Sequence, residues 1–341
     1  MSFSSLLPQL SDEQAIWIAY MAMPVMAIPI IHFGSREALL EVHQENSEKM
    51  SRQDAMWFPL IGSCVLFGFY LAFKYFEPAY LNYLLMAYFG CFGVATVGAL
   101  LTKVLERNFP RLTSLGSLSV SLKLSDKPAH ESVLTCCHLI GYLLASAVTA
   151  VYAYSRHWVL NNVLGIAFSI SAISTLHLDS FGTGMALLAG LFLYDIFWVF
   201  GTDVMVSVAK NFEVPVKLLF PRNLTSPDPK FTLLGLGDIV IPGVMVALCL
   251  RFDTEKPSAR RRYYELCLAF YAAGLVTTVL VMHCFKAAQP ALLYLSPACT
   301  LPILAMAALR GELKELFAFG QKAEEASKPE EEGSDSSSEE E

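Results

Sequence analysis

Long runs of uncharged, apolar residues recur from one end of this chain to the other, and they restrict its fold more than any other feature. A helix of about 20 apolar residues spans the hydrocarbon core of a bilayer. Inside that core the backbone must pair its own polar groups, which favours helices. The runs are continuous rather than alternating between polar and apolar residues, which excludes a β-barrel. We therefore predict an all-α polytopic membrane protein.

Nine runs are long enough to be transmembrane helices. They cover residues 15–33, 56–76, 79–102, 133–153, 158–178, 182–205, 232–251, 263–285 and 288–309. The ends of such assignments are accurate to a few residues. The first fourteen residues lack Lys and Arg, and the first run is longer than the apolar part of a signal peptide. We interpret it as the first membrane helix rather than a cleaved signal.

Lys and Arg are distributed unevenly between the two sides that nine crossings create. One side carries 17 of these residues and the other carries 7. Because cytosolic loops are richer in Lys and Arg, we predict a luminal amino terminus and a cytosolic carboxyl terminus. The loop 206–230 lies on the predicted luminal side although it holds four positive charges. It contains the chain's single Asn-x-Ser/Thr sequon, at Asn223, which is a candidate glycosylation site.

Two aspartates lie within apolar runs that follow one another in the chain. Asp195 lies in LFLYDIFWVF, and Asp238 lies in LGLGDIVIPG. A carboxylate near the middle of a membrane costs roughly 2.5–3.5 kcal/mol on insertion scales, so such a residue usually serves a function. If the two helices are antiparallel neighbours, the carboxyl groups meet at similar depth.

A facing pair of carboxyl groups in a low dielectric holds one shared proton, because both groups cannot ionise readily. One member then acts as a base on a water molecule while the other donates a proton to a substrate carbonyl. This chemistry needs no metal, cofactor or covalent intermediate, and the eight cysteines show no metal-ligand spacing. The residues thus favour an aspartyl protease with Asp195 and Asp238 as the catalytic pair.

The residues around Asp238 predict an irregular start to the run 232–251. Gly235 would share a helical face with Asp238 and admit another backbone, and Gly237 removes a second Cβ. Pro242 cannot donate a hydrogen bond to the Asp238 carbonyl. We therefore predict a kinked or unwound helix start.

The connections between runs carry weaker signals. The segment 214–220 predicts a strand or an interfacial segment, and 103–132 predicts a flexible loop. Residues 321–341 hold nine acidic and two basic side chains, which account for the whole net charge of −7. The remainder is balanced and gives no sign of a nucleic-acid partner, whereas the acidic segment predicts disorder.

An aspartate pair inside the membrane is compatible with functions other than proteolysis. A proton-coupled transporter would relay protons through the same carboxyl groups. A non-catalytic membrane chaperone would bind peptides in the same groove. A purely structural role would bond each aspartate to a neighbouring helix. Single Asp→Asn variants distinguish these functions, because only hydrolysis needs both carboxyl groups.

Three motifs resemble those of a known family. Tyr194-Asp195, Gly235-Leu236-Gly237-Asp238 and Gln289-Pro290-Ala291-Leu292 resemble the YD, GxGD and PAL motifs of the presenilin and signal peptide peptidase family of intramembrane aspartyl proteases. The motifs occur in order on the sixth, seventh and ninth runs, and the resemblance covers residues 52–314. The wider sequence is more similar to the signal peptide peptidase branch than to the presenilins.

The resemblance implies a presenilin-like fold of nine transmembrane helices and a set of site residues. Asp195 and Asp238 would be catalytic, and the residues that would support the active site or bind substrate are Tyr194, Gly235, Gly237, Gln289, Pro290, Ala291 and Leu292. The chain would divide into a luminal segment 1–14, a scaffold part 15–178, a catalytic part 179–314 and a cytosolic, acidic, disordered tail 315–341.

The resemblance also implies a substrate class and a location. Members of the family cleave type II-oriented membrane segments, such as signal-peptide remnants, in the membrane of the endoplasmic reticulum. The expected partners are therefore membrane-spanning peptides and lipid, and a homo-oligomer is compatible with the sequence. No cofactor is expected.

Overall fold

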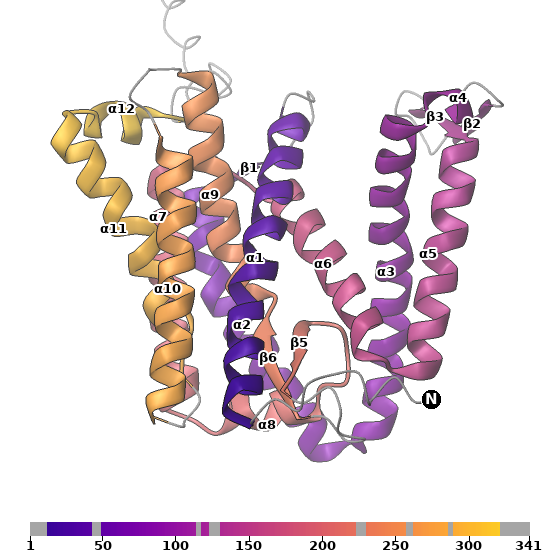
Figure 1. Ribbon diagram of the computed structural model, residues 1–341, viewed down its shortest axis with the longest axis horizontal. Coiled ribbons are helices and arrows are strands. Elements are labelled where there is room, and N and C mark those ends of the chain that lie inside the picture. Colours follow the sequence, from indigo (N-terminus) through magenta and orange to yellow (C-terminus); the bar gives the residue numbers. More distant parts are fainter. Residues whose placement is uncertain are drawn as a thin grey trace, which may run out of the picture.

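The computed structural model describes residues 12–42, 49–113, 117–122, 130–222, 230–256, 262–285 and 289–320. Within these ranges, most of the chain is helical (Figure 1). The long helices are α1 (Asp12–Val42), α2 (Arg52–Tyr75), α3 (Pro78–Asn108), α5 (Cys136–Ser155), α6 (Trp158–Thr175), α7 (Phe181–Phe200), α9 (Gly237–Glu255), α10 (Tyr263–Phe285) and α11 (Leu292–Arg310). The short helices are α4 (Pro110–Thr113), α8 (Val204–Asn211) and α12 (Leu313–Ala318).

In the described part of the chain, 8 helices are long and apolar enough to cross a membrane. The chain is therefore an all-α, multi-pass membrane protein. Helix α9 is the long helix outside this group, because it carries Asp238 near its start and Arg251, Asp253 and Glu255 near its end. The ninth crossing stays a prediction.

Three two-stranded sheets connect the helices. The strands are β1 (Lys49–Met50), which pairs with β4 (His177–Leu178) in parallel, β2 (Ser117–Leu122), which pairs with β3 (His130–Thr135) antiparallel, and β5 (Lys217–Pro221), which pairs with β6 (Phe231–Gly235) antiparallel. The strand predicted within 214–220 is confirmed by β5. The flexible loop predicted at 103–132 is wrong where α3 continues to Asn108 and where β2 and β3 pair.

The helices pack around two main hydrophobic cores, and a third, minor cluster around Phe73 and Val208 joins α2, α3 and α8. The larger core joins α1, α7, α9, α10 and α11, and its fully buried residues include Ile31, Met245 and Leu295. The smaller core joins α3, α5 and α6 around Leu164 and Phe168. In Figure 1, α3 and α5 stand side by side and α6 runs obliquely between them and the rest of the helices. The aspartate-bearing helices α7 and α9 both belong to the larger core.

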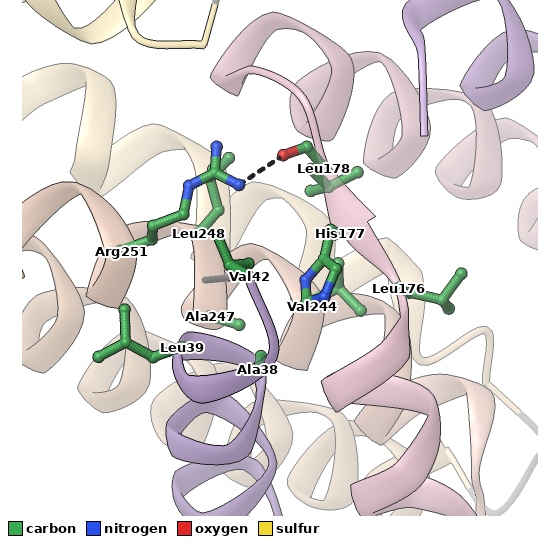
Figure 2. A pocket seen from close by; sticks show the side chains of 10 residues that line it. All are labelled: Ala38, Leu39, Val42, Leu176, His177, Leu178, Val244, Ala247, Leu248 and Arg251. Carbon is green, nitrogen blue, oxygen red and sulfur yellow. Dashed lines mark hydrogen bonds between the residues drawn. The ribbon is translucent and has the colours of Figure 1, made fainter. Parts of the chain in front are cut away.

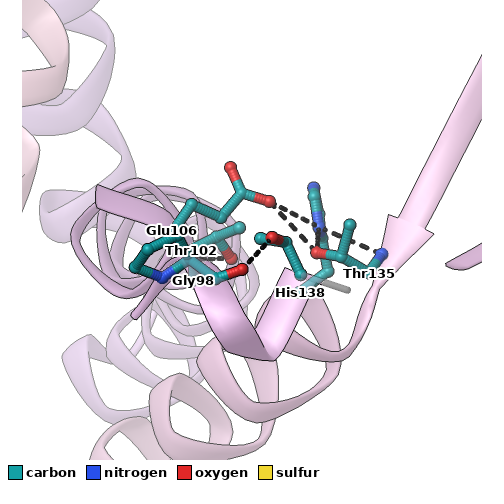
Figure 3. A network of polar contacts seen from close by, with 7 residues as sticks. Gly98, Thr102, Glu106, Thr135 and His138 are labelled. Carbon is teal, nitrogen blue, oxygen red and sulfur yellow. Dashed lines mark hydrogen bonds and ion pairs between the residues drawn. The ribbon is translucent and has the colours of Figure 1, made fainter. Parts of the chain in front are cut away.

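Different short elements lie at the two ends of the helices (Figure 1). We call the end that carries α12 and the β2–β3 hairpin the α12 end, and the opposite end, which carries α8, the α8 end. At the α12 end, Thr135 precedes α5 and its hydroxyl donates to Glu106 Oε1 at 3.0 Å (Figure 3). The same hydroxyl lies 2.7 Å from His138 Nδ1, so this network joins the ends of α3 and α5.

Candidate active site

Helix α7 buries Asp195 in the larger core. The helix begins at Phe181 because the Ser180 side chain accepts a hydrogen bond from the Thr183 amide at 3.3 Å. Asp195 follows in the fourth turn, and its side chain is only 5% exposed. Its Oδ2 accepts a hydrogen bond from the Leu292 backbone amide at 3.0 Å. The carboxyl group is therefore held by the first residue of α11.

Asp238 lies where a strand becomes a helix. Strand β6 ends at Gly235, Leu236 caps the helix, and α9 begins at Gly237, so Asp238 is its second residue. The predicted unwound start is confirmed by this strand. The prediction that Gly235 shares a helical face with Asp238 is wrong, because Gly235 belongs to β6.

Gly235 nevertheless contacts the carboxyl group. A Cβ added to it would lie 3.2 Å from Asp238 Oδ2, whereas a Cβ on Gly237 would meet nothing within 4 Å. Gly235 thus lets β6 pass close to the carboxyl oxygen. Gly237 is exposed and Asp238 is only partly buried, so the site stays accessible on this side.

The two carboxyl groups belong to one site. Asp195 and Asp238 are close enough to interact electrostatically. Helices α7 and α11 also pack against each other and against α9, which brings Leu292 to the same place. A carboxyl pair within a mostly apolar core has the arrangement that sharing one proton requires.

The other predicted site residues lie around this pair. Tyr194 directs its ring towards Trp198, with centroids 6.3 Å apart, and also lies beside Gly62 of α2. Pro290 is buried, and its carbonyl accepts from the Leu293 amide at 3.3 Å. Ala291 is the cap of α11, and its carbonyl accepts from the Leu295 amide at 3.1 Å.

Of the remaining predictions, Gln289 is partly buried two residues before this cap. The candidate glycosylation site Asn223 and residues 321–341 of the predicted tail lie outside the described residues. The prediction that the disordered tail begins at residue 315 is wrong, because α12 extends to Ala318.

Two asparagines of α6 complete the hairpin that leads to Asp238. In this hairpin residues 218, 220 and 222 pair with 234, 232 and 230, so the odd-numbered residues of each strand direct their backbone groups outwards. On the β5 side, Asn162 accepts from the Leu219 amide at 2.8 Å and donates to the Leu219 carbonyl at 2.9 Å. Asn161 donates to the Lys217 carbonyl at 2.7 Å.

The outer edge of β6 has no comparable hydrogen bonds from side chains of the described residues. Among the described residues, no hydrogen-bond partner occupies the outward backbone groups of Phe231, Leu233 and Gly235. The sequence did not indicate this asymmetry, because Asn161 and Asn162 lie in an apolar run far from the hairpin in sequence. The free edge lies directly beside Asp238.

A pocket at the α12 end is separate from the aspartate pair. It lies between α1, β4 and α9, and neither aspartate lines it (Figure 2). Its polar residues are His177 and Arg251, and Arg251 donates to the Leu178 carbonyl at 3.1 Å. Burial lowers the pKa of His177 from its ordinary value of 6.5. This pocket therefore does not contain the chemistry predicted for the chain.

Comparison with known proteins gives the same assignment as the motifs. Residues 42–323 match the family model described as signal peptide peptidase. The chain is 41% identical over 326 residues to the signal peptide peptidase of Mus musculus, covering 91% of this chain and 85% of that protein. It is 40% identical to the human signal peptide peptidase over the same length and coverage. It is 33% identical over 306 residues to a probable intramembrane protease of Schizosaccharomyces pombe, covering 88% and 93%.

The family match covers both aspartates, the β5–β6 hairpin and the start of α11. The membrane-spanning helices, the two interacting aspartates and these relatives all indicate the same activity. The chain belongs to the signal peptide peptidase family and is an intramembrane aspartic endopeptidase.

Proposed function

We propose that Asp195 and Asp238 are the catalytic residues and that they hydrolyse a peptide bond of a membrane-spanning substrate. The observation that carries this proposal is the electrostatically coupled pair in the larger core, with Asp195 held by the Leu292 amide. One carboxylate removes a proton from a water molecule, whose oxygen bonds to the scissile carbonyl carbon. The other carboxyl group protonates the carbonyl oxygen. The C–N bond then breaks and the amine takes up a proton.

The free edge of β6 supports a substrate in extended form. A membrane-spanning segment is helical and its carbonyl groups are occupied, so it must unwind before water can attack it. An unwound segment that pairs with the outward groups of Leu233 regains backbone hydrogen bonds as an added strand. Because β6 runs into Gly235 and Asp238, this pairing places the extended backbone beside the carboxyl pair.

The substrates that we propose are type II-oriented segments such as signal-peptide remnants. The names of the mouse and human relatives support this class. We further propose an endoplasmic reticulum location, a luminal amino terminus and a cytosolic carboxyl terminus, which the 17 to 7 distribution of Lys and Arg supports. In this orientation the α12 end faces the cytosol. The catalytic part would comprise residues 179–314.

The decisive experiment is cleavage of a signal-peptide-derived segment by the purified full chain in detergent. Asp195→Asn and Asp238→Asn should each lower kcat by roughly 10⁴-fold, because a catalytic unit fails when one member is lost. Asp203→Asn is the matched control, since Asp203 directly precedes α8 and makes no capping hydrogen bond with its side chain. Cleavage that survives either single substitution would remove that residue from the mechanism. Retained peptide binding without cleavage by the parent would favour the chaperone function.

A second experiment tests the added strand. Substrates with single N-methylated amides near the scissile bond lose one backbone donor at a time. Only alternate positions face β6 in a strand pair, so cleavage should fall at every second position. Equal sensitivity at neighbouring positions would contradict strand addition without affecting the assignment of Asp195 and Asp238.

A further inference from the structure

Tyr271 of α10 has its hydroxyl buried without a partner. The side chain is 0% exposed and is among the largest fully buried side chains of the described residues. Within those residues, its hydroxyl makes no hydrogen bond. Two other tyrosines of the same helix are satisfied: Tyr263 donates to Glu312 Oε2 at 2.7 Å, and the Tyr264 hydroxyl lies 2.6 Å from His32 Nδ1. A buried hydroxyl without a partner costs free energy, so its position needs an explanation.

The face of α10 that carries Tyr271 packs against α11 and α9. One turn before it, the Cys267 thiol lies 3.8 Å from the Cys299 carbonyl of α11. One turn after it, Gly274 packs so closely on α11 that an added Cβ would lie 2.9 Å from Ala298 Cβ. Tyr271 therefore lies between these two contacts, against the helix whose first amide holds Asp195. Its hydroxyl interacts electrostatically with Asp238 of α9.

The titratable groups that interact with this hydroxyl are Asp238 of α9 and Cys299 of α11. Cys299 in turn interacts with Cys267 of α10, which also interacts with Cys249 of α9. Helix α7 contributes Asp195, which interacts with Asp238.

Helix α1 also packs on α10, and two of its titratable residues contact other residues of α10. Tyr20 lies against His283, and His32 lies against Tyr264. Of all these groups, Asp238 is the carboxyl group with which the Tyr271 hydroxyl interacts electrostatically.

We propose that Tyr271 is a positioning residue, whose hydroxyl donates a hydrogen bond to the Asp238 carboxylate when the substrate-bound site is assembled. The inference rests on the proposed catalytic pair. A donor to Asp238 favours its ionised form, which is the form that takes a proton from water. Asp195 is then the member that carries the shared proton. The Leu292 amide remains compatible with this role, because a protonated carboxyl group still accepts at its carbonyl oxygen.

The test compares Tyr271→Phe with the parent chain in the cleavage assay, measured across pH. The substitution keeps the buried ring and removes only the hydroxyl. We expect kcat to fall about 10- to 100-fold, as for loss of a hydrogen bond to a charged group, with KM unchanged. We also expect the acidic limb of the pH–rate profile to move to higher pH, because the carboxylate loses its donor. A purely structural role would not move this limb.

Tyr263→Phe is the matched control. Tyr263 is also fully buried on α10, but its hydroxyl bonds to Glu312 at the α12 end. It should leave kcat and the pH profile of cleavage unchanged. An unchanged kcat in Tyr271→Phe, or a lower kcat with an unshifted profile, would overturn the inference.

Two further measurements keep the outcome interpretable. Asp238→Asn measured in parallel must be inactive, and cleavage by that variant would instead overturn the proposed function. If Tyr271→Phe does not fold, replacement of Tyr271 by difluorotyrosine keeps the shape and makes the hydroxyl a stronger donor. The acidic limb should then move to lower pH, and an unmoved limb would contradict the inference.

Discussion

At the scale of single residues, the site depends on backbone groups as much as on side chains. The Leu292 amide donates a hydrogen bond to Asp195, and Gly235 lies close to Asp238 because it has no side chain. A side-chain substitution at Leu292 leaves the amide in place. Alanine scanning therefore does not detect the positioning role of Leu292. It does detect the role of Gly235, because alanine adds a Cβ there.

We predict that Gly235→Ala lowers kcat about 10-fold, because the added Cβ would lie 3.2 Å from Asp238 Oδ2 and shift that oxygen. Gly237→Ala is the control, since its Cβ would meet nothing within 4 Å. It should leave cleavage unchanged. Kinetics of both variants on one substrate check this prediction. An equal loss in the two variants would show that glycine is needed there for another reason than proximity to the carboxyl group.

At the scale of secondary-structure elements, α6 holds the hairpin that positions Asp238. The asparagines of α6 satisfy the outer edge of β5 and leave the edge of β6 free. The same helix packs against α1, α3 and α9, so it links the hairpin to both hydrophobic cores. The position of Asp238 thus depends on a helix that carries no catalytic residue.

Asn162→Ala should destabilise the folded chain by about 1–3 kcal/mol, because it leaves the Leu219 amide and carbonyl unpaired in a partly buried place. The Tm in detergent measures this loss. Asn108→Ala is the control, because Asn108 is exposed and, within the described ranges, its side chain bonds only to the Val104 carbonyl. A Tm loss no larger than that of the control would show that α6 does not hold the hairpin through this side chain.

His177 lies in strand β4, which pairs with β1, and its protonation makes the stability of the folded chain depend on pH. Burial lowers the pKa of His177, so the unfolded chain binds a proton at a higher pH than the folded chain does. Nearby Glu41 opposes this effect, and nearby Arg251 and Lys49 add to it. The contribution of neutral His177 to stability is complete above its ordinary pKa of 6.5 and is lost as the pH falls below it.

His177→Gln should therefore flatten the fall of Tm between neutral and mildly acidic pH. Thermal unfolding of the parent and variant at a series of pH values measures the difference. His157→Asn is the control, because His157 is exposed and Asn keeps an acceptor at the start of α6. Parallel curves for the parent and His177→Gln would show that this histidine does not titrate on unfolding.

At the scale of the whole molecule, residues 313–320 contact several helices at the α12 end. The Phe319 ring lies 5.0 Å from the Arg251 guanidinium and packs edge-on against Phe252. Arg251 in turn bonds to the chain between α6 and α7. Gly320 has a φ of 90° and lies directly against the Asp179 carbonyl. Residues 313–320 thus join α9, α11 and the start of α7.

Gly320→Ala should release this segment, since its Cβ would overlap the Asp179 carbonyl oxygen and alanine disfavours positive φ. We expect faster proteolysis within residues 313–320 and a lower Tm. Gly311→Ala has the same conformational cost, about 1–2 kcal/mol, but its Cβ would meet open space. Equal proteolysis of the two variants would show that the contact with Asp179 does not hold the segment.

The sequence by itself determined the membrane helices and identified Asp195 and Asp238 as candidate catalytic residues. Both are local properties: a long apolar run is stable across a bilayer whatever its neighbours are, and a carboxylate within it is costly unless it serves a function. The irregular start at Asp238 was also predictable, because Gly235, Gly237 and Pro242 each weaken a helix.

The tertiary structure decided what surrounds these residues. Residues 231–235 continue an apolar run, yet they form β6, because β5 and the asparagines of α6 supply hydrogen bonds that a lone segment lacks. The Leu292 amide reaches Asp195 across 97 residues, and Tyr271 of a separate helix interacts electrostatically with Asp238. Such contacts depend on which helices become neighbours. The pattern of a single apolar run does not specify its neighbours, because every face of it is compatible with lipid as well as with protein.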